Sequence, residues 1–335
     1  MNAPTSAERS SGIHPTRSVG TGRAHAKVIL LGEHAVVYGA PALALPVPQL
    51  LVTASAGWAS RACDDLNDVS FTATGSAPSP VVPPARDGLR RLAAAYKATA
   101  GVGRGPGLDV VIDGSIPPGR GLGSSAAYAR AVVLALADLF GRELTESEAF
   151  DLVQTAETAT HGRSSGVDAR AVGAAAPLRF QDGRVQELSV GCDGLLVIAD
   201  SGVMGGTKDA VELLGEVFRR RAGTRQGFVD RASRLTDEAG LALAAGAAER
   251  FGARLTEYHE LLSSTGLSTR RIDAMVGAAL TAGSLGAKLT GGGLGGCVIA
   301  LTRPEHARQV IRRLNESGAV HTWAVPLRGS GDHVS

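Results

Sequence analysis

Short apolar runs, separated by polar or glycine-containing breaks, recur along the first third of the chain, a pattern typical of β-strands. They predict strands over 28–31, 36–38, 42–55, 69–74 and 108–112. The first three are expected to be antiparallel and joined by short turns. The apolar spacing of 88–100 predicts a helix before the last strand.

Beyond these strands, apolar residues recur mainly at helical spacing. Thr145 and Glu148 form the pattern of a capping box, in which each side chain bonds the other's backbone amide, so a helix should start there and run to about His161. Further helices are predicted over 128–140, from 166, and over 206–221, 226–246, 251–265, 269–282 and 304–317. Strands are predicted over 177–181, 185–190, 194–199, 285–289, 297–301 and 319–327.

This order of elements predicts an α+β protein, in which strands and helices are partly segregated. A length of 335 residues predicts two domains, which we expect over 21–190 and 191–330. Residues 1–20 are rich in Ser, Thr, Gly and Pro and lack a continuous apolar stretch. They therefore predict a disordered tail and not a signal peptide.

Composition narrows the class of protein. Hydrophobic residues make up 44% and charged residues 20% of the chain, which is typical of a soluble globular protein, and no apolar run approaches the ~18 residues of a membrane helix. The net charge of +2, with no block of like charge, argues against a nucleic-acid or membrane-surface partner. Cys63, Cys192 and Cys297 have no CxxC spacing, which argues against a disulfide framework or a zinc site and fits a reducing cytoplasm.

The most informative segment is a glycine-dense loop that leads into a predicted helix, Pro117–Ala127, with the sequence PPGRGLGSSAA. Glycines let the backbone approach a ligand closely, and a helix N-terminus presents unpaired N–H groups and partial positive charge. Such a loop favours an anion, most often phosphate, and the hydroxyls of Ser124 and Ser125 could meet a metal on that phosphate. The pattern matches neither a P-loop nor a dinucleotide fingerprint, so by itself it is equally compatible with an ordinary helix cap.

A second glycine loop lies between two predicted strands, at Lys288–Cys297, with the sequence KLTGGGLGGC. Five glycines in six positions exceed the need of a simple turn and indicate close backbone approach. Two such loops in one chain fit a triphosphate and a second substrate better than they fit a flexible hairpin.

Several polar side chains occupy unusual places. Lys27 lies in an apolar strand pattern, Glu33 and His34 follow that strand, and Asp168 begins a predicted helix. Glu157 lies near the end of a helix, where the dipole disfavours a carboxylate and a bound cation would favour it. Each has an ordinary structural explanation. Together with the loops, they supply what phosphoryl transfer to an alcohol needs: a phosphate cradle, oxygen ligands for a hard cation, a carboxylate base and a positive charge.

These motifs resemble those of the GHMP kinases. Lys27–Ala44, with the sequence KVILLGEHAVVYGAPALA, resembles the family's first motif in the form that its mevalonate kinase branch carries. The two glycine loops resemble the second and third motifs. Ser165–Asp168 and Asp200–Gly202 with Thr207–Lys208 are similar to the same branch, so the resemblance spans about residues 23–300.

The resemblance implies a two-domain GHMP kinase fold. Its N-terminal domain would be a ribosomal S5 domain 2-like α/β domain, its C-terminal domain ferredoxin-like α+β, and its active site would lie in the cleft between them. The implied reaction is transfer of phosphate from Mg²⁺-bound ATP to the C5 hydroxyl of (R)-mevalonate, a step of the mevalonate pathway of isoprenoid biosynthesis. A cytoplasmic enzyme is expected, with ATP and a small molecule as its partners and with a homodimer as the common state.

Carried over to this chain, the resemblance makes Asp168 the base for the substrate hydroxyl and pairs Lys27 with it, to stabilise charge on the attacking oxygen. Ser125 and Glu157 would hold Mg²⁺. The implied triphosphate-binding residues are Pro117, Gly119, Arg120, Gly121, Leu122, Gly123, Ser124, Ser125 and Ala126. The implied mevalonate-binding residues are Lys27, Glu33, His34, Asp168, Thr207, Gly292 and Gly293.

Some positions depart from the family pattern. His25 and Ala26 stand where Pro-Gly usually precedes the lysine, and we expect His25 to be structural. Leu294 replaces a common glycine and should narrow the freedom of the second loop. Register alone leaves open whether Ser124 or Ser125 is the metal ligand.

Two alternatives remain open. Phosphomevalonate kinase, homoserine kinase and diphosphomevalonate decarboxylase share the fold, but a phosphorylated substrate should need extra basic residues, which the segment 33–34 lacks. A non-catalytic sensor of the same fold would need no base and metal ligands together, so the presence of Lys27, Ser125, Glu157 and Asp168 counts against it.

Overall fold

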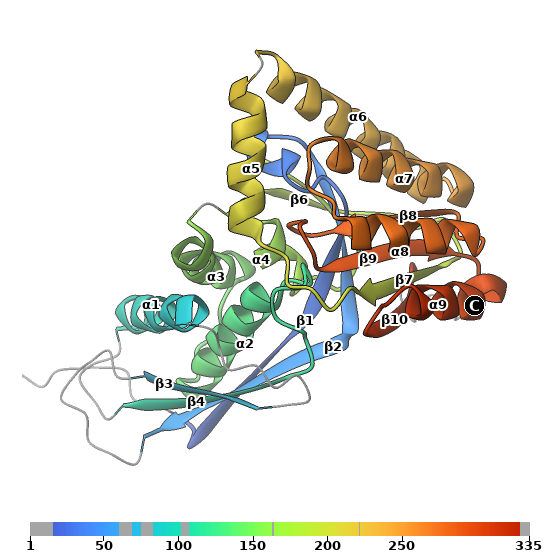
Figure 1. Cartoon of the computed structure of the whole chain (residues 1–335). Helices are drawn as coiled ribbons and strands as arrows, with labels where there is room; N and C mark the ends of the chain where they lie inside the picture. Colours follow the sequence, from blue (N-terminus) through green and yellow to red (C-terminus); the bar gives the residue numbers. More distant parts are fainter. Residues whose placement is uncertain are drawn as a thin grey trace, which may run out of the picture. The chain divides into compact units, whose positions relative to one another are not determined.

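The computed structural model describes residues 16–59, 69–74, 83–101, 107–162, 164–220 and 222–328. Contacts divide the chain into two compact units: Met1–Ala24, Val52–Gly114 and Tyr128–Gly162 form the first, and His25–Leu51, Ser115–Ala127 and Arg163–Ser335 form the second. Both units combine helices and strands, which confirms the α+β class (Figure 1). The domains expected over 21–190 and 191–330 stay predictions, and most of the expected tail, residues 1–15, lies outside the described residues.

The first unit combines a small sheet with three helical segments. Its strands are the beginning of β1 (Val19–Leu31), the second half of β2 (Ala42–Trp58), β3 (Val69–Thr74) and β4 (Leu108–Gly114). Its helices are α1 (Pro83–Thr99), most of α2 (Ser124–Leu139) and α3 (Glu146–His161). β3 runs parallel to β4, β4 runs antiparallel to β2, and α1 and α3 lie side by side (Figure 1). Buried and exposed residues alternate along β4, as in a strand with one covered face.

The predicted capping box fixes the start of α3. The Glu148 amide donates to Thr145 Oγ1 at 3.2 Å, and the Thr145 amide donates to Glu148 Oε2 at 2.9 Å. Two N-terminal amides thus have side-chain acceptors, which is the reason why the helix begins where the sequence predicts.

The second unit contains a four-stranded antiparallel sheet in the order β10-β7-β9-β8. The strands are β7 (Leu195–Asp200), β8 (Gly286–Thr290), β9 (Cys297–Thr302) and β10 (His321–Pro326). The helices are α5 (Thr207–Arg220), α6 (Thr224–Ala244), α7 (Ala248–Ser264), α8 (Arg270–Thr281) and α9 (Ala307–Glu316). α7, α8 and α9 pack on the sheet and α6 packs on α7 (Figure 1). Every residue of β8 and β9 is buried, so a polar side chain on either strand needs a partner inside the protein.

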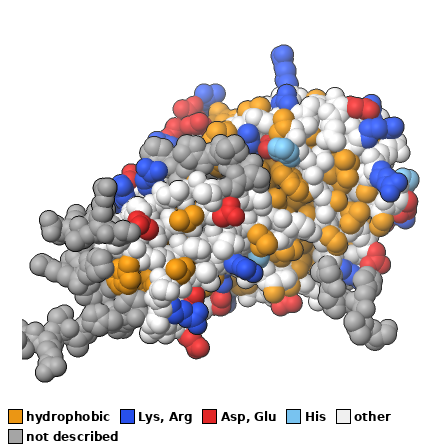
Figure 2. Space-filling view, turned by 90° about the horizontal axis from the view of Figure 1, so that it is seen from below, with side chains coloured by type: hydrophobic (Ala, Val, Ile, Leu, Met, Phe, Trp, Pro, Cys, Tyr) orange, Lys and Arg blue, Asp and Glu red, His pale blue; other side chains and the backbone are white. Residues whose placement is uncertain are grey.

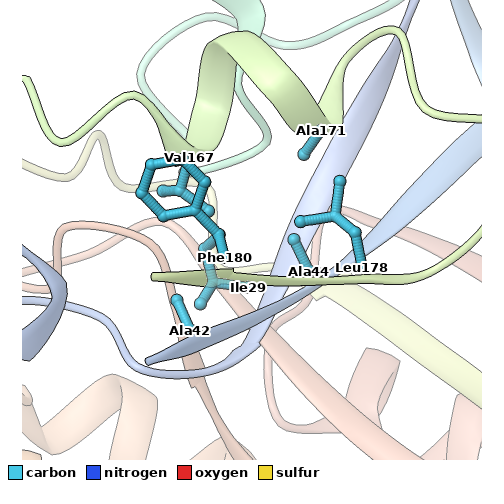
Figure 3. Packing of buried hydrophobic residues seen from close by; sticks show 7 residues of the cluster. All are labelled: Ile29, Ala42, Ala44, Val167, Ala171, Leu178 and Phe180. Atoms are coloured by element: carbon cyan, nitrogen blue, oxygen red, sulfur yellow. The ribbon is translucent and has the colours of Figure 1, made fainter. Parts of the chain in front are cut away.

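An apolar cluster in the second unit holds the short helix α4 (Val167–Ala171) against three strands. β5 (Leu178–Gln181) pairs antiparallel with the start of β2 and with β6 (Arg184–Glu187), and β1 (Val19–Leu31) also pairs with β2. The cluster consists of Ile29, Ala42, Ala44, Val167, Ala171, Leu178 and Phe180 (Figure 3). Because two of these residues belong to α4, the cluster fixes the position of the helix that carries Asp168.

The strand predicted over 36–38 is wrong: Ala35–Tyr38 forms a 3₁₀ helix, η1. The chain turns sharply just before it, at His34 with φ of 61°, and a three-residue apolar run does not distinguish a strand from a helical turn. Several other boundaries differ from the prediction. β1 begins at Val19 instead of 28, α1 at Pro83 instead of 88 and α2 at Ser124 instead of 128. The turn Pro304–His306 (η2) precedes α9.

The distribution of charged side chains and the hydropathy of the helices, among the described residues, agree with what the composition predicts. On the face shown in Figure 2, basic and acidic side chains of the described residues are interspersed instead of forming a patch of one sign. Of the helices that the structure describes, none has the length and apolar character needed to span a bilayer.

Candidate active site

The first glycine loop is built from alternating left-handed glycines, with φ of 68° at Gly119, 77° at Gly121 and 72° at Gly123. A Cβ on Gly121 would lie 2.6 Å from Thr290 O, and one on Gly123 would lie 2.8 Å from Lys27 Cε. Both positions therefore need glycine for conformation and for space. The loop leads directly into α2 and so offers an anion the N-terminus of a 16-residue helix. Ser124 and Ser125 are the first two residues of that helix.

Lys27 and Asp168 meet beside this loop. Lys27 Nζ lies 3.0 Å from Asp168 Oδ1 and donates to Gly121 O at 3.1 Å. The Lys27 side chain is 2% exposed and the Asp168 side chain is 30% exposed. The predicted pairing of the two side chains is confirmed. The lysine is enclosed, whereas the carboxylate keeps an open side that another group can approach.

The strand that carries Lys27 is tied to the loop by its backbone. The Lys27 amide donates to Leu122 O at 3.0 Å, and the His25 amide donates to Val172 O at 3.2 Å. The two ring nitrogens of His25 lie 2.8 Å from Ala26 O and 2.9 Å from Ala174 O. These contacts are all to backbone groups, which supports the structural role expected of His25.

The second glycine loop packs directly on the first. A Cβ on Gly291 would lie 2.5 Å from Gly121 Cα, so backbone meets backbone at this point. Leu294 adopts φ of 58°, and its amide donates to Leu267 O at 2.9 Å. The leucine therefore takes the left-handed conformation that a glycine would take there, and a hydrogen bond to the α7–α8 connection holds it.

The residues expected in the mevalonate pocket fall into two groups. His34, Thr207 and Gly292 come together: His34 Nε2 lies 3.0 Å from Gly292 O, and a Cβ on Gly292 would lie 2.6 Å from Thr207 Oγ1. Burial lowers the pKa of His34 to about 4, so its ring is neutral at pH 7. Glu33, in contrast, is only 5% exposed and forms an ion pair with Lys288. Gly293 packs against the backbone of Leu267, where a Cβ would lie 2.6 Å from Leu267 O.

Three site features were missed in the sequence. Lys288 forms the ion pair with Glu33, Tyr258 donates to Glu33 O at 3.0 Å, and Asp200 Oδ2 lies 3.2 Å from Arg120 Nε. Lys288 could have been recognised in the sequence, because it is a lysine inside a strand pattern next to a glycine loop, and Lys27 also lies inside a strand pattern. Tyr258 lies on α7 and carried no signal that places it beside Glu33.

The expected metal ligands lie on different helices. Glu157 is 3% exposed on α3, and Ser125 is on the first turn of α2, so their sharing of one ion stays a prediction. Among the described residues, no group of three or more His, Cys, Asp or Glu side chains could hold a metal. A cation here would need phosphate oxygens in addition to protein oxygens. Such a donor set fits Mg²⁺ at kinase sites.

Comparisons with known proteins agree with this arrangement. The family models of the GHMP kinases N terminal domain and the GHMP kinases C terminal match residues 88–174 and 241–320. The chain is 31% identical over 311 residues to the mevalonate kinase of Pyrococcus horikoshii, covering 89% of this chain and 92% of that protein. This chain belongs to the mevalonate kinases, a branch of the GHMP kinases.

Other mevalonate kinases match over similar lengths. That of Aeropyrum pernix is 32% identical over 308 residues, covering 88% of this chain and 91% of the other. The crystal structure of L. major mevalonate kinase in complex with R-mevalonate has a TM-score of 0.81 at 24% identity, covering 94% of this chain and 98% of that one. These findings confirm the GHMP kinase fold, and membership of a kinase family makes the chain an ATP-using kinase.

Proposed function

We propose that this kinase transfers the γ-phosphoryl group of ATP to the C5 hydroxyl of (R)-mevalonate and forms 5-phosphomevalonate. The curated relatives at about 30% identity are mevalonate kinases. The observation that carries the proposal is the Lys27–Asp168 pair, 3.0 Å apart, beside two glycine loops that pack closely against each other. A base, a cation and an anion cradle at one place are the parts that phosphoryl transfer to an alcohol requires.

In the proposed mechanism, the open side of the Asp168 carboxylate accepts the proton of the C5 hydroxyl as its oxygen forms a bond to the γ-phosphorus. The bond from that phosphorus to the β–γ bridging oxygen breaks, and ADP leaves. Lys27 stabilises negative charge near the attacking oxygen. The amides of Gly119–Ser125 and the N-terminus of α2 stabilise charge on the phosphate oxygens, since these dipoles are oriented before the reaction begins.

We also propose that Ser125 and Glu157 contribute oxygen ligands to Mg²⁺, with Ser124 as the alternative hydroxyl. The bound ion would neutralise charge on the β- and γ-phosphates. The burial of the Glu157 carboxylate, at 3% exposure, supports this role because a buried carboxylate favours a cation nearby.

The charges on the acceptor side favour mevalonate over a substrate that already carries phosphate. Lys27 pairs with Asp168, Lys288 pairs with Glu33, and His34 is neutral at pH 7. The basic groups placed here are thus already compensated or uncharged. A second phosphate would need a cation that these residues do not offer.

A coupled ADP-release assay against mevalonate, phosphomevalonate, homoserine and galactose tests the proposal. We expect turnover of (R)-mevalonate with kcat/KM far above that of the other three. Preference for phosphomevalonate or homoserine would assign the chain to another GHMP activity. ATP binding without turnover of any of them would indicate the sensor alternative. The homodimer and the cytoplasmic location stay predictions, which light scattering and cell fractionation would check.

A further inference from the structure

Lys288 is a buried cation that the proposed reaction does not use. It lies in the middle of β8, where every residue is buried, and its own exposure is 0%. Its ammonium donates to Glu33 Oε1 and to Leu289 O, and it lies 5.5 Å from the centroid of the Tyr258 ring. A lysine is retained at such a place only when its partners compensate the loss of water. The residues that contact Lys288 therefore indicate which part of the structure it fixes in place.

The main partner, Glu33, is held by both its side chain and its backbone. Its carboxylate pairs with Lys288, and its carbonyl accepts a hydrogen bond from Tyr258 Oη at 3.0 Å. Tyr258 is itself fully buried on α7. Two elements of the second unit, β8 and α7, thus fix Glu33, the second residue after the end of β1.

Glu33 lies in the middle of a strained turn. Gly32 has φ of 105° and His34 has φ of 61°, so left-handed residues flank Glu33 on both sides. Histidine in this conformation is unfavourable and persists only where its surroundings enforce it. The turn directs the His34 ring towards the second glycine loop, where Nε2 lies 3.0 Å from Gly292 O. A carbonyl can only accept, so the ring N–H donates to it.

We propose that Lys288 is a positioning residue for the acceptor alcohol, because it anchors Glu33 and thereby holds His34 and Gly292 at the wall of the acceptor pocket. Lys288 itself does not touch the substrate. Loss of its charge would release the carboxylate of Glu33, let the strained turn relax, and separate His34 from Gly292. The binding of ATP would be less affected, since Lys27 contacts Gly121 and Asp168 without Lys288. This inference rests on the function proposed above.

The test is a double-mutant cycle of Lys288→Met and Glu33→Gln, with KM measured separately for mevalonate and ATP. We expect each single variant to raise KM for mevalonate at least about tenfold and KM for ATP less than about threefold. The double variant should resemble either single variant, because the two side chains act as one unit. Effects that multiply in the double variant, equal changes in both KM values, or an unchanged KM for mevalonate would each overturn the proposal.

Stability is separated from positioning by a matched control. Val298→Ala truncates a buried side chain on β9, opposite Leu289, and should lower the Tm without changing either KM. A selective rise of KM for mevalonate in this control would show that instability alone produces the effect. If Lys288→Met does not fold, the double variant carries the test, since it leaves no lone charge buried.

A measurement without substrate keeps the inference separate from the proposed function. Amide hydrogen exchange of residues 32–38 should become faster in Lys288→Met and stay unchanged in Val298→Ala. Unchanged exchange in Lys288→Met would refute the anchoring of the turn, whatever alcohol the enzyme phosphorylates. If the unmodified enzyme does not turn over mevalonate, the proposed function fails, while the exchange experiment still decides whether Lys288 anchors the turn.

Discussion

Replacement of Asp168 by Asn gives the most direct test of the mechanism, because it removes the proposed base and keeps the size of the side chain. General-base catalysis typically contributes about 10²–10⁴-fold to a rate, so kcat should fall by that factor. The change also removes the negative charge that pairs with Lys27. Lys27 Nζ would keep its hydrogen bond to Gly121 O, at 3.1 Å.

The cost in stability can be bounded from the geometry. Breaking a fully buried ion pair costs about 3–5 kcal/mol, but the Asp168 side chain is 30% exposed, so water compensates part of the loss. We therefore expect the free energy of unfolding to fall by about 1–3 kcal/mol. ATP affinity should change little, since the nucleotide is expected to contact the glycine loop rather than the carboxylate.

The assay is single-turnover phosphate transfer, with ATP affinity measured by calorimetry and stability by urea unfolding. Asp237→Asn is the control, because it breaks an exposed pair with Arg179 at 2.9 Å and should leave kcat unchanged. If Asp168→Asn keeps kcat within about tenfold of the unmodified enzyme and binds ATP normally, Asp168 is not the base.

Three further predictions concern the first glycine loop, the proposed metal ligand Glu157 and the loss of stability at acidic pH. Gly123→Ala should raise KM for ATP at least about tenfold and destabilise the fold by about 1–3 kcal/mol, because Gly123 has φ of 72° and the new Cβ would lie 2.8 Å from Lys27 Cε. Normal ATP kinetics in this variant would argue against phosphate binding by the first glycine loop. Glu157→Gln should shift Mg²⁺ activation to higher concentration, and an unchanged Mg²⁺ titration would remove Glu157 as a ligand. The pKa of His34 is lowered to about 4 in the folded protein, so below pH 6.5 the unfolded chain binds a proton that the folded chain does not. The free energy of unfolding should therefore fall by about 2 kcal/mol between pH 7 and pH 5. Urea unfolding at both pH values checks this loss, which should be smaller in His34→Gln; an equal loss in that variant would assign it to other groups.

Most of the fold could be predicted from the sequence because its signals are local. The strand over 69–74 and the helix that starts at the Thr145 capping box occur where the apolar pattern and the cap predict them. The run 36–38 failed because its conformation depends on the turn at His34, which long-range contacts stabilise. Three apolar residues carry too little periodicity to show such a turn.

The site was predictable in its residue types and less so in its pairings. The Lys27–Asp168 pair followed from the motifs and is present at 3.0 Å. Glu33 was expected to face the substrate, and the structure shows it paired with Lys288 instead of freely exposed. Arg120 was expected on the triphosphate, and its guanidinium lies beside Asp200. These pairings join segments far apart in the chain, and the apolar pattern does not show which of the polar side chains will pair.

The contact between Gly121 and Gly291 has a consequence for the order of folding. Each of these residues occupies space that a side chain on the other would need, and 170 positions separate them along the chain. We therefore expect the first loop to take its final shape only after β8 has been synthesised and joined to its sheet. A nascent chain that ends before residue 291 would lack a finished cradle. Acquisition of ATP affinity during refolding or translation should thus be a late event, and bound nucleotide would mark molecules whose C-terminal sheet is complete.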